Sequence, residues 1–178
     1  MFTLSCESTV DLPWSYIQSR KISVIEYSYL VNDQEYPDDM GRNPDSMPQF
    51  YRFLEDGVIP KTSQITEMAY EAYLEGLLQK GDVLHLGFGT GMTPSILNGI
   101  AAGEKLQAKY PDRRIIVIDT TCSSSGYGML VDDVADLRDA GKDLDEIVEW
   151  IKCHSRRLHH PFFSTTLSYY RRSGRLSG

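Results

Sequence analysis

The sequence predicts an α/β fold of three layers, in which a mostly parallel sheet carries helices on both faces. Three observations lead to this prediction. Strand-like and helix-like segments alternate along the 178 residues, as they do when a crossover helix follows each strand. Residues 115–118 are a continuous run of β-branched apolar residues, which is typical of a parallel strand covered on both faces. The composition, 41% hydrophobic and 24% charged, is that of a globular chain with one core.

Four segments are predicted to be strands. Phe2–Ser5 and Ser23–Val31 are short runs of residues that favour extended backbone. Asp82–Leu86 and Arg114–Asp119 are apolar enough to be covered on both faces of a parallel sheet. We therefore expect the last two strands to lie at the centre of the sheet.

Two helices are predicted on either side of the third strand. Residues 66–80 have helical periodicity, and Gly81 provides a C-terminal stop. The next helix begins with Thr93 as N-cap and Pro94 at the first helical position, where the missing N–H is not needed. The residues expected to face inward are Ile65, Ala69, Tyr73 and Leu77 in the first helix and Ile96, Leu97, Ile100 and Ala101 in the second.

Two further helices are expected after the last strand, and one short helix near the N-terminus. The serines 123–125 are suited to cap a helix that ends before Gly141 and buries Leu130, Val134 and Leu137. Asp143 and Glu146 have the spacing of a capping box at the start of another helix. Ser8 and Thr9 can cap a helix that starts near Pro13.

The charge distribution excludes one class of partner and leaves another open. The net charge of −7 argues against nucleic acid, because phosphate binding depends on clustered Lys and Arg. Basic residues do gather near the end of the chain, where they form either a solvated helix face or a surface for a partner. This group is Arg156, Arg157, Arg171, Arg172 and Arg175.

Cysteine usage and hydropathy predict a cytoplasmic protein. The three cysteines, Cys6, Cys122 and Cys153, are widely spaced and form no CxxC pair, so neither a disulfide framework nor a zinc site is expected. The first residues have no basic segment followed by an apolar one, and no run of about 18 apolar residues occurs. We expect neither export nor stable membrane insertion.

The segment Leu84–Pro94, LHLGFGTGMTP, leads from a strand through a glycine-rich turn into a helix. Gly87, Gly89 and Gly91 allow a ligand to approach the main chain, and the free N–H groups at a helix start favour an anion. A phosphate, a carboxylate or a methionine-derived cofactor would fit such a turn.

One alternative function follows from this turn. It resembles the first motif of class I S-adenosylmethionine-dependent methyltransferases, and Asp119 ends the next strand as a ribose-binding acid would. Two features oppose this reading. His85 stands where these enzymes usually carry an acidic residue, and Asp119 follows Gly91 by 28 residues, against the roughly 20 typical of a dinucleotide-type site.

Four motifs, in order along the whole chain, resemble those of the DegV family of bacterial fatty-acid-binding proteins. CESTVDLP resembles the family's SDSTADLP, and TSQ resembles its TSQPS. VIDTTCSSSGYG resembles its VIDS segment, and the final LSYYRRSGRLSG resembles its LxYLxRGGRIS. These motifs occupy residues 6–13, 62–64, 117–128 and 167–178.

This resemblance implies a non-catalytic lipid carrier. Members are two-domain α/β proteins that hold a long-chain fatty acid in a tunnel between the domains, with its carboxylate bound by hydroxyl groups, and several present it to a separate fatty-acid kinase. By this resemblance, Thr62 and Ser63 are the expected carboxylate ligands. Gly91 replaces the serine of the family's serine-glycine-threonine turn, so Gly91 and Thr93 are the further residues expected to line the head-group pocket.

Structural roles offer alternatives for these residues. Thr62 and Ser63 can serve as turn or capping hydroxyls before Glu67, and the N-cap role alone would account for Thr93. We expect no catalysis, because no sequence rule brings a histidine base to Cys122 or the serines after it. No metal is expected either, since the adjacent His159 and His160 would point to opposite faces of an extended segment.

By the same resemblance, residues 1–178 are expected to be an N-terminal α/β domain that ends at or just after the junction to a missing second domain. Arg171, Arg172 and Arg175 would then lie near the junction and could meet a kinase or the ligand's charge. Tunnel-lining surface left exposed would favour self-association. A further alternative is a truncated remnant with an interaction role only.

Overall fold

The protein is described by a computed structural model that covers residues 2–172. Its main sheet has four parallel strands in the order β2-β1-β6-β7. A second, antiparallel sheet has the order β4-β3-β5. The elements are β1 (Phe2–Glu7), η1 (Ser8–Val10), α1 (Trp14–Ser19), β2 (Ser23–Ile25), β3 (Ser28–Val31), β4 (Gln34–Pro37), α2 (Ser46–Glu55), β5 (Lys61–Thr62), α3 (Glu67–Leu78), β6 (Asp82–Gly87), α4 (Ser95–Lys109), β7 (Ile115–Asp119), α5 (Ser124–Asp139), α6 (Leu144–His154), η2 (Ser155–Arg157) and α7 (Ser168–Arg172).

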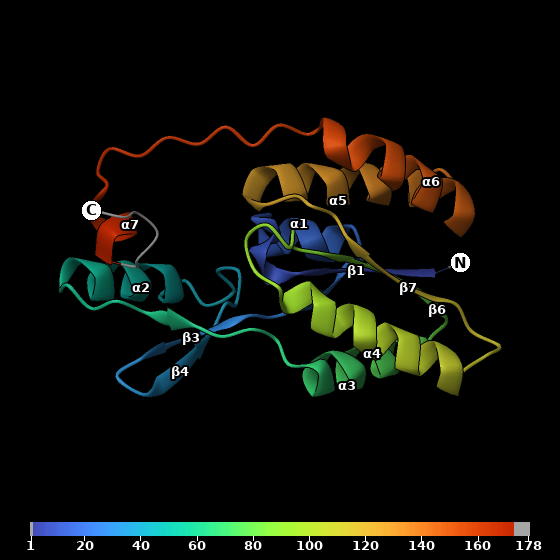
Figure 1. Cartoon of the computed structure of the whole chain (residues 1–178), viewed down its shortest axis with the longest axis horizontal. Helices are drawn as coiled ribbons and strands as arrows, with labels where there is room; N and C mark the ends of the chain where they lie inside the picture. Colours follow the sequence, from blue (N-terminus) through green and yellow to red (C-terminus); the bar gives the residue numbers. More distant parts are fainter. Residues whose placement is uncertain (1, 173–178) are drawn as a thin grey trace.

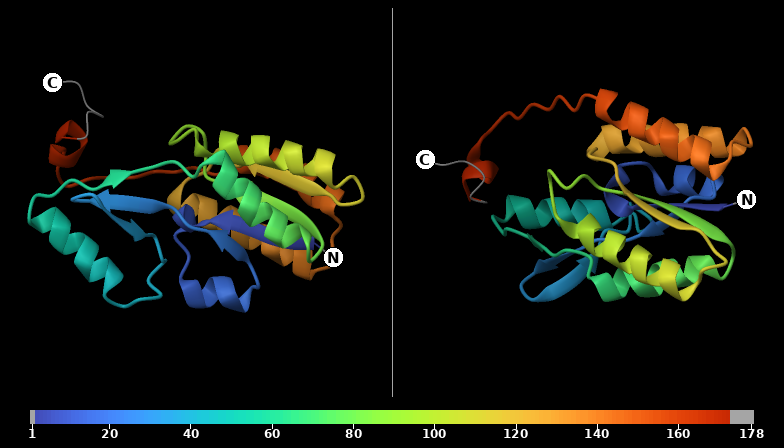
Figure 2. Two further views of the ribbon diagram at one scale, coloured as in Figure 1. Left: turned by 90° about the horizontal axis from the view of Figure 1, so that it is seen from below. Right: turned by 45° about the vertical axis from the view of Figure 1, so that its right-hand side comes forward.

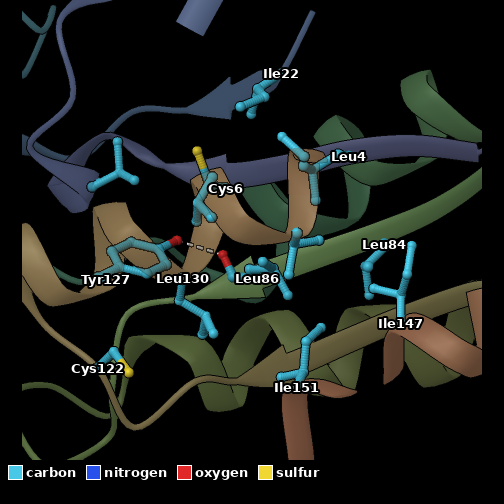
Figure 3. Close-up of a cluster of buried hydrophobic side chains, with 14 of the residues drawn as sticks. Leu4, Cys6, Ile22, Leu84, Leu86, Cys122, Tyr127, Leu130, Ile147 and Ile151 are labelled. Atoms are coloured by element: carbon cyan, nitrogen blue, oxygen red, sulfur yellow. Dashed lines mark hydrogen bonds between the residues drawn. The ribbon is translucent and has the colours of Figure 1, made fainter. Parts of the chain in front are cut away.

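Helices cover both faces of the main sheet, which confirms the predicted three-layer α/β fold (Figure 1). On one face, α1, α5 and α6 pack against side chains such as Leu4 and Leu86 (Figure 3). On the other face, α3 and α4 pack against Val83 and Ile115. Alternate strand residues point to opposite faces, so each strand contributes to both cores.

The strand predictions need two corrections. The central strands are β1 and β6, whereas β7 lies at an edge of the main sheet, so the expected central position of Arg114–Asp119 is wrong. Its apolar run is explained by cover on both faces, because Ile116 packs into one core and Ile115 into the other. The predicted strand Ser23–Val31 is two strands, and β2 and β3 belong to different sheets.

The small sheet and α2 lie beyond the carboxyl ends of the main-sheet strands, opposite the N-terminus (Figures 1 and 2). Aromatic rings join them. Tyr29 stacks on Tyr36 with ring centroids 5.4 Å apart. Phe50 of α2 meets Tyr29 edge-on with centroids 5.1 Å apart, and Phe53 of α2 meets Tyr36 edge-on at 5.5 Å. No residue of α2 is buried. The small sheet therefore packs through ring contacts more than through a closed core.

The predicted helices occur, but several details differ. The capping box is confirmed, since Asp143 accepts from the Glu146 N–H at 2.8 Å and Glu146 accepts from the Asp143 N–H at 3.1 Å. Helix α4 starts one residue later than predicted, with Pro94 rather than Thr93 at the N-cap. Leu97 was expected inside, yet it is 53% exposed; the buried face of α4 runs through Ile96, Gly99, Ala102 and Leu106.

The other capping predictions also change. In α3 the N-cap is Thr66, and Ala69 lies on the exposed side while Tyr70, Leu74 and Leu77 are buried. Ser123 stands at the N-cap of α5 without a side-chain capping bond. Ser8 does not cap α1, because its hydroxyl accepts from the Tyr27 N–H.

Candidate functional site

A cavity of about 590 Å³ opens where the main-sheet strands end and the small sheet begins. Thr9, Phe88 and Thr93 line it from the loops after β1 and β6. Tyr29 and Phe50 line it from the small sheet and α2. Ligands bind open α/β sheets at the carboxyl ends of strands, so this position and size are typical of a ligand site.

Three of the four residues predicted to bind a head group meet in this cavity. Thr62, Ser63 and Thr93 all line it. Gly91 does not, although its neighbour Met92 does. The structure thus brings two chain segments 30 residues apart to one cavity.

The hydroxyls of Thr62 and Ser63 have no structural role in the described part of the chain. The capping hydroxyl before α3 comes from Thr66, which accepts from the Ala69 N–H at 3.2 Å. The alternative reading of Thr62 and Ser63 as helix caps is therefore wrong. Both residues are exposed, so their hydroxyls are available to a ligand.

The Thr93 hydroxyl can also donate a hydrogen bond to a ligand. Its hydroxyl oxygen accepts from the Ser95 N–H at 3.3 Å, which leaves the hydroxyl hydrogen for another acceptor. The Ser95 hydroxyl cannot bind a ligand in this way, because Ser95 is fully buried and its hydroxyl accepts from the Ile65 N–H. The Met92 N–H is also taken, since it donates to the Gly89 carbonyl at 2.9 Å.

Close packing requires glycine at two positions of the glycine-rich turn. A Cβ on Gly87 would lie 1.9 Å from the Ile96 side chain, and one on Gly89 would lie 2.8 Å from the Thr121 backbone. Gly91 faces open space and its φ is not positive, so neither sterics nor backbone conformation requires glycine there. None of the three glycines has a positive φ, so close packing at Gly87 and Gly89 accounts for glycine there, and no special backbone conformation does.

Asp119 holds the same turn in place. One of its carboxyl oxygens accepts from the Thr90 hydroxyl at 2.6 Å, and the other accepts from the N–H groups of Thr90 and Thr121 at 3.2 and 2.9 Å. A ribose-binding acid needs free oxygens, so this arrangement disfavours the methyltransferase reading.

The apolar lining and two acids were missed by sequence reasoning. Met47 and Phe50 of α2 line the cavity together with Asp38 and Asp39. Burial would raise the pKa of Asp39, but hydrogen bonds from Ser46 and from the backbone N–H groups at 41 and 43 outweigh it and hold the pKa below its usual value. An anionic ligand is repelled by these carboxylates and favoured beside the hydroxyls.

Behind the cavity wall lies Glu7, whose side chain has no solvent exposure. It accepts hydrogen bonds from Tyr27, Tyr70 and the Phe88 N–H. Burial, and then the charge of Glu7, raise the pKa of both tyrosines, so both keep their protons. One feature of the sequence could have drawn attention to Glu7, because it is a charged residue at the end of a buried strand.

Two of the histidines considered for catalysis, His85 and His160, have different surroundings. His85 is buried, and its Nδ1 lies 2.9 Å from the Ser5 hydroxyl, as expected for a core histidine. His160 does reach the serine-rich segment, since a Cβ on Gly126 would lie 2.2 Å from its Nε2. Among the residues that the structure describes, that Nε2 has no hydrogen-bond partner, and the Ser124 hydroxyl donates to the Asp11 carboxylate.

Three further expectations concern metals, membrane insertion and the basic end of the chain. Within residues 2–172, no group of three or more His, Cys, Asp or Glu is placed to hold a metal ion. No helix in this range is both long and apolar enough to cross a bilayer. Arg171 is exposed on α7, while the Arg172 side chain and Arg175 lie outside the described residues.

A family model described as "Uncharacterised protein, DegV family" matches residues 2–178. The chain belongs to the DegV family. A DegV domain-containing protein of Clostridium perfringens is 31% identical over 99% of this chain and 60% of its own length. The chain thus spans about 60% of the length of such curated relatives. The assignment of residues 1–178 to an N-terminal domain stays a prediction.

Solved DegV structures share the fold. A DegV family protein of Ruminococcus gnavus, described with vaccenic acid, has a TM-score of 0.83 at 17% identity, covering 99% of this chain and 62% of that one. The Streptococcus pneumoniae Fatty Acid Kinase (Fak) B3 protein, loaded with linoleic acid, has a TM-score of 0.70 at 19% identity, with 88% and 54% covered. Both solved structures are described with a fatty acid, and their fold is the fold of this chain.

Proposed function

We propose that this protein is a non-catalytic lipid carrier that holds a long-chain fatty acid by its carboxylate. The observation that carries the proposal is the meeting of Thr62, Ser63 and Thr93 in one cavity that also has apolar walls. A fatty acid needs both, because its carboxylate requires hydrogen-bond donors and its chain requires apolar cover. Gly91, next to this wall, takes no direct part in binding in this proposal.

The orientation of the ligand follows from charge. Asp38 and Asp39 also line the cavity, and a carboxylate beside them would be repelled. The head group is therefore placed at the hydroxyls, with the acyl chain along Met47, Phe50 and Phe88. The occurrence of fatty acids in DegV structures of the same fold supports this ligand class.

Presentation of the bound fatty acid to a separate kinase is the second part of the proposal. It is supported by the similarity in fold to the Streptococcus pneumoniae Fatty Acid Kinase (Fak) B3 protein. The exposed Arg171 on α7 offers a positive contact for an acidic kinase surface. A pull-down with a purified fatty-acid kinase, compared between the native chain and Arg171→Glu, measures this contact.

Exposed apolar side chains on the elements around the cavity support self-association as a further property. Met47 and Met92 line the cavity and are 52% and 66% exposed. Tyr51 and Leu97, on α2 and α4, are 55% and 53% exposed. Soluble monomers rarely leave such residues grouped in solvent, so two copies are proposed to cover these surfaces mutually.

The carrier proposal is tested by native mass spectrometry of the purified protein, followed by organic extraction of what it carries. We expect a fatty acid in the wild-type extract. In a Thr62→Ala/Ser63→Ala variant the affinity should fall at least roughly tenfold, since a hydrogen bond to a charged group contributes about 1.5–3 kcal/mol. Ser19→Ala, which removes an exposed hydroxyl outside the cavity, serves as control.

The other possible results of this experiment each point to a different function or a different site. Uptake of S-adenosylmethionine in place of fatty acid would replace the carrier by the methyltransferase. A chain that takes up neither ligand, yet binds a protein partner, would fit the remnant with an interaction role only. Equal binding by the double variant and the wild type would move the head-group site elsewhere.

A further inference from the structure

Glu7 is a fully buried carboxyl group whose hydrogen bonds come from three separate segments of the chain. Its Oε2 accepts from the Phe88 N–H at 2.9 Å and from the Tyr27 hydroxyl at 3.3 Å. Its Oε1 accepts from the Tyr70 hydroxyl of α3. A buried carboxyl without partners is strongly destabilising, so these donors and Glu7 hold one another in place.

Two of these three donors form the cavity wall. Tyr27 and Phe88 both line the cavity, whereas Tyr70 does not. Tyr27 comes from the link between the two sheets, and Phe88 is the first residue after β6. A single carboxyl group therefore connects the main sheet to the segment that leads into the small sheet, directly behind the ligand site.

The main chain of Glu7 is fixed as firmly as its side chain. The Glu7 N–H donates to the Tyr127 hydroxyl at 3.0 Å, and Tyr127 in turn donates to the Leu86 carbonyl (Figure 3). On the other side, His85 Nε2 lies 3.8 Å from Glu7 Oε1. The carboxyl group cannot shift without disturbing the core, so its position is well suited to define that of its partners.

From this geometry we propose that Glu7 is a positioning residue of the ligand site, which fixes Tyr27 and Phe88 and thereby sets the shape and depth of the cavity. The inference rests on the proposed function, which it deepens by naming a determinant of affinity and acyl-chain preference. Glu7 does not touch the ligand. It acts through the two wall residues that it bonds.

Two tyrosines provide a matched test. Tyr27→Phe and Tyr70→Phe each remove one hydroxyl that donates to Glu7, but only Tyr27 lines the cavity. Glu7→Gln keeps the shape of the side chain and replaces one acceptor oxygen by an amide that cannot accept. We expect Glu7→Gln and Tyr27→Phe to weaken fatty-acid binding roughly tenfold and to change the preferred acyl length. Tyr70→Phe leaves the bonds from Glu7 to both wall residues in place, so it should have a clearly smaller effect on binding and on acyl preference.

A second measurement does not depend on any ligand. Hydrogen exchange at the Phe88 N–H should accelerate at least roughly tenfold in Glu7→Gln, relative to neighbouring amides of β6, because its acceptor is weakened. Unchanged binding in Tyr27→Phe, or equal losses in Tyr27→Phe and Tyr70→Phe, would overturn the positioning role. A wild-type chain that binds no fatty acid would refute the proposed function, and unchanged exchange at Phe88 would separately refute the role of Glu7.

Discussion

Single side chains in this protein have sharply different environments even when they are of one type. Cys6 and Cys122 are buried, whereas Cys153 is exposed near the end of α6. Burial raises the pKa of the Cys6 and Cys122 thiols, and the charge of Glu7 adds to the shift at Cys6. Since the thiolate is the reactive form, both burial and pKa protect these two residues.

We therefore expect one reactive thiol in the folded chain. A thiol reagent at neutral pH should modify Cys153 rapidly and leave Cys6 and Cys122 intact, because a reagent reaches neither and their thiols stay protonated. Peptide mapping after brief labelling measures this directly, with a denatured sample as control in which all three react. Rapid labelling of Cys6 in the native chain would contradict the packing around β1.

Some residue-level features can be named from the sequence, whereas others depend on neighbours that are distant in the chain. Thr62, Ser63 and Thr93 could be named from motif resemblance, and they do share a cavity. Glu7 received no role, because its role depends on donors that lie 20 to 81 residues away in the chain. Leu97 was misplaced because apolar identity alone does not give the direction of a helix face.

Sequence patterns that span only a few residues predict the helices better than the strands. The capping box at Asp143 is complete within four residues, so the sequence there already contains the whole interaction. The division of Ser23–Val31 between two sheets cannot be inferred locally, because β2 pairs with β1 while β3 pairs with β4 and β5. The small sheet and α2 were not predicted, since strands β4 and β5 have only four and two residues.

The small sheet should open more readily than the main sheet, because α2 buries no residue and is held by ring contacts. Hydrogen exchange should be faster in β3 and β4 than in β1 and β6. Phe53→Ala removes an edge-on ring contact with Tyr36, worth about 0.5–1.5 kcal/mol, and should accelerate exchange in β4 without changing that in β6. Leu130→Ala, in the main core, is the control and should accelerate exchange in both sheets.

At the scale of the molecule, alternation of strands and helices was enough to predict the three layers but not the strand order. The apolar run of β7 is compatible with a central or an edge strand, since helices cover both faces of either. The cavity lies at the carboxyl ends of the strands, as the general rule for α/β sheets predicts, yet part of its wall comes from the small sheet and α2, which the sequence did not reveal.

The surface around that cavity leads to a prediction about assembly. Met47 and Met92 are exposed at its rim, and a lysine at both positions would place charge on the surface proposed to self-associate. In sedimentation velocity over a wide concentration range, the native chain should form dimers that Met47→Lys/Met92→Lys abolishes. Met129→Lys, on the exposed side of α5, alters an equally exposed methionine elsewhere and should leave the dimer intact. A native chain that stays monomeric throughout, or a Met129→Lys variant that dissociates like the double variant, would show that the cavity rim is not the contact.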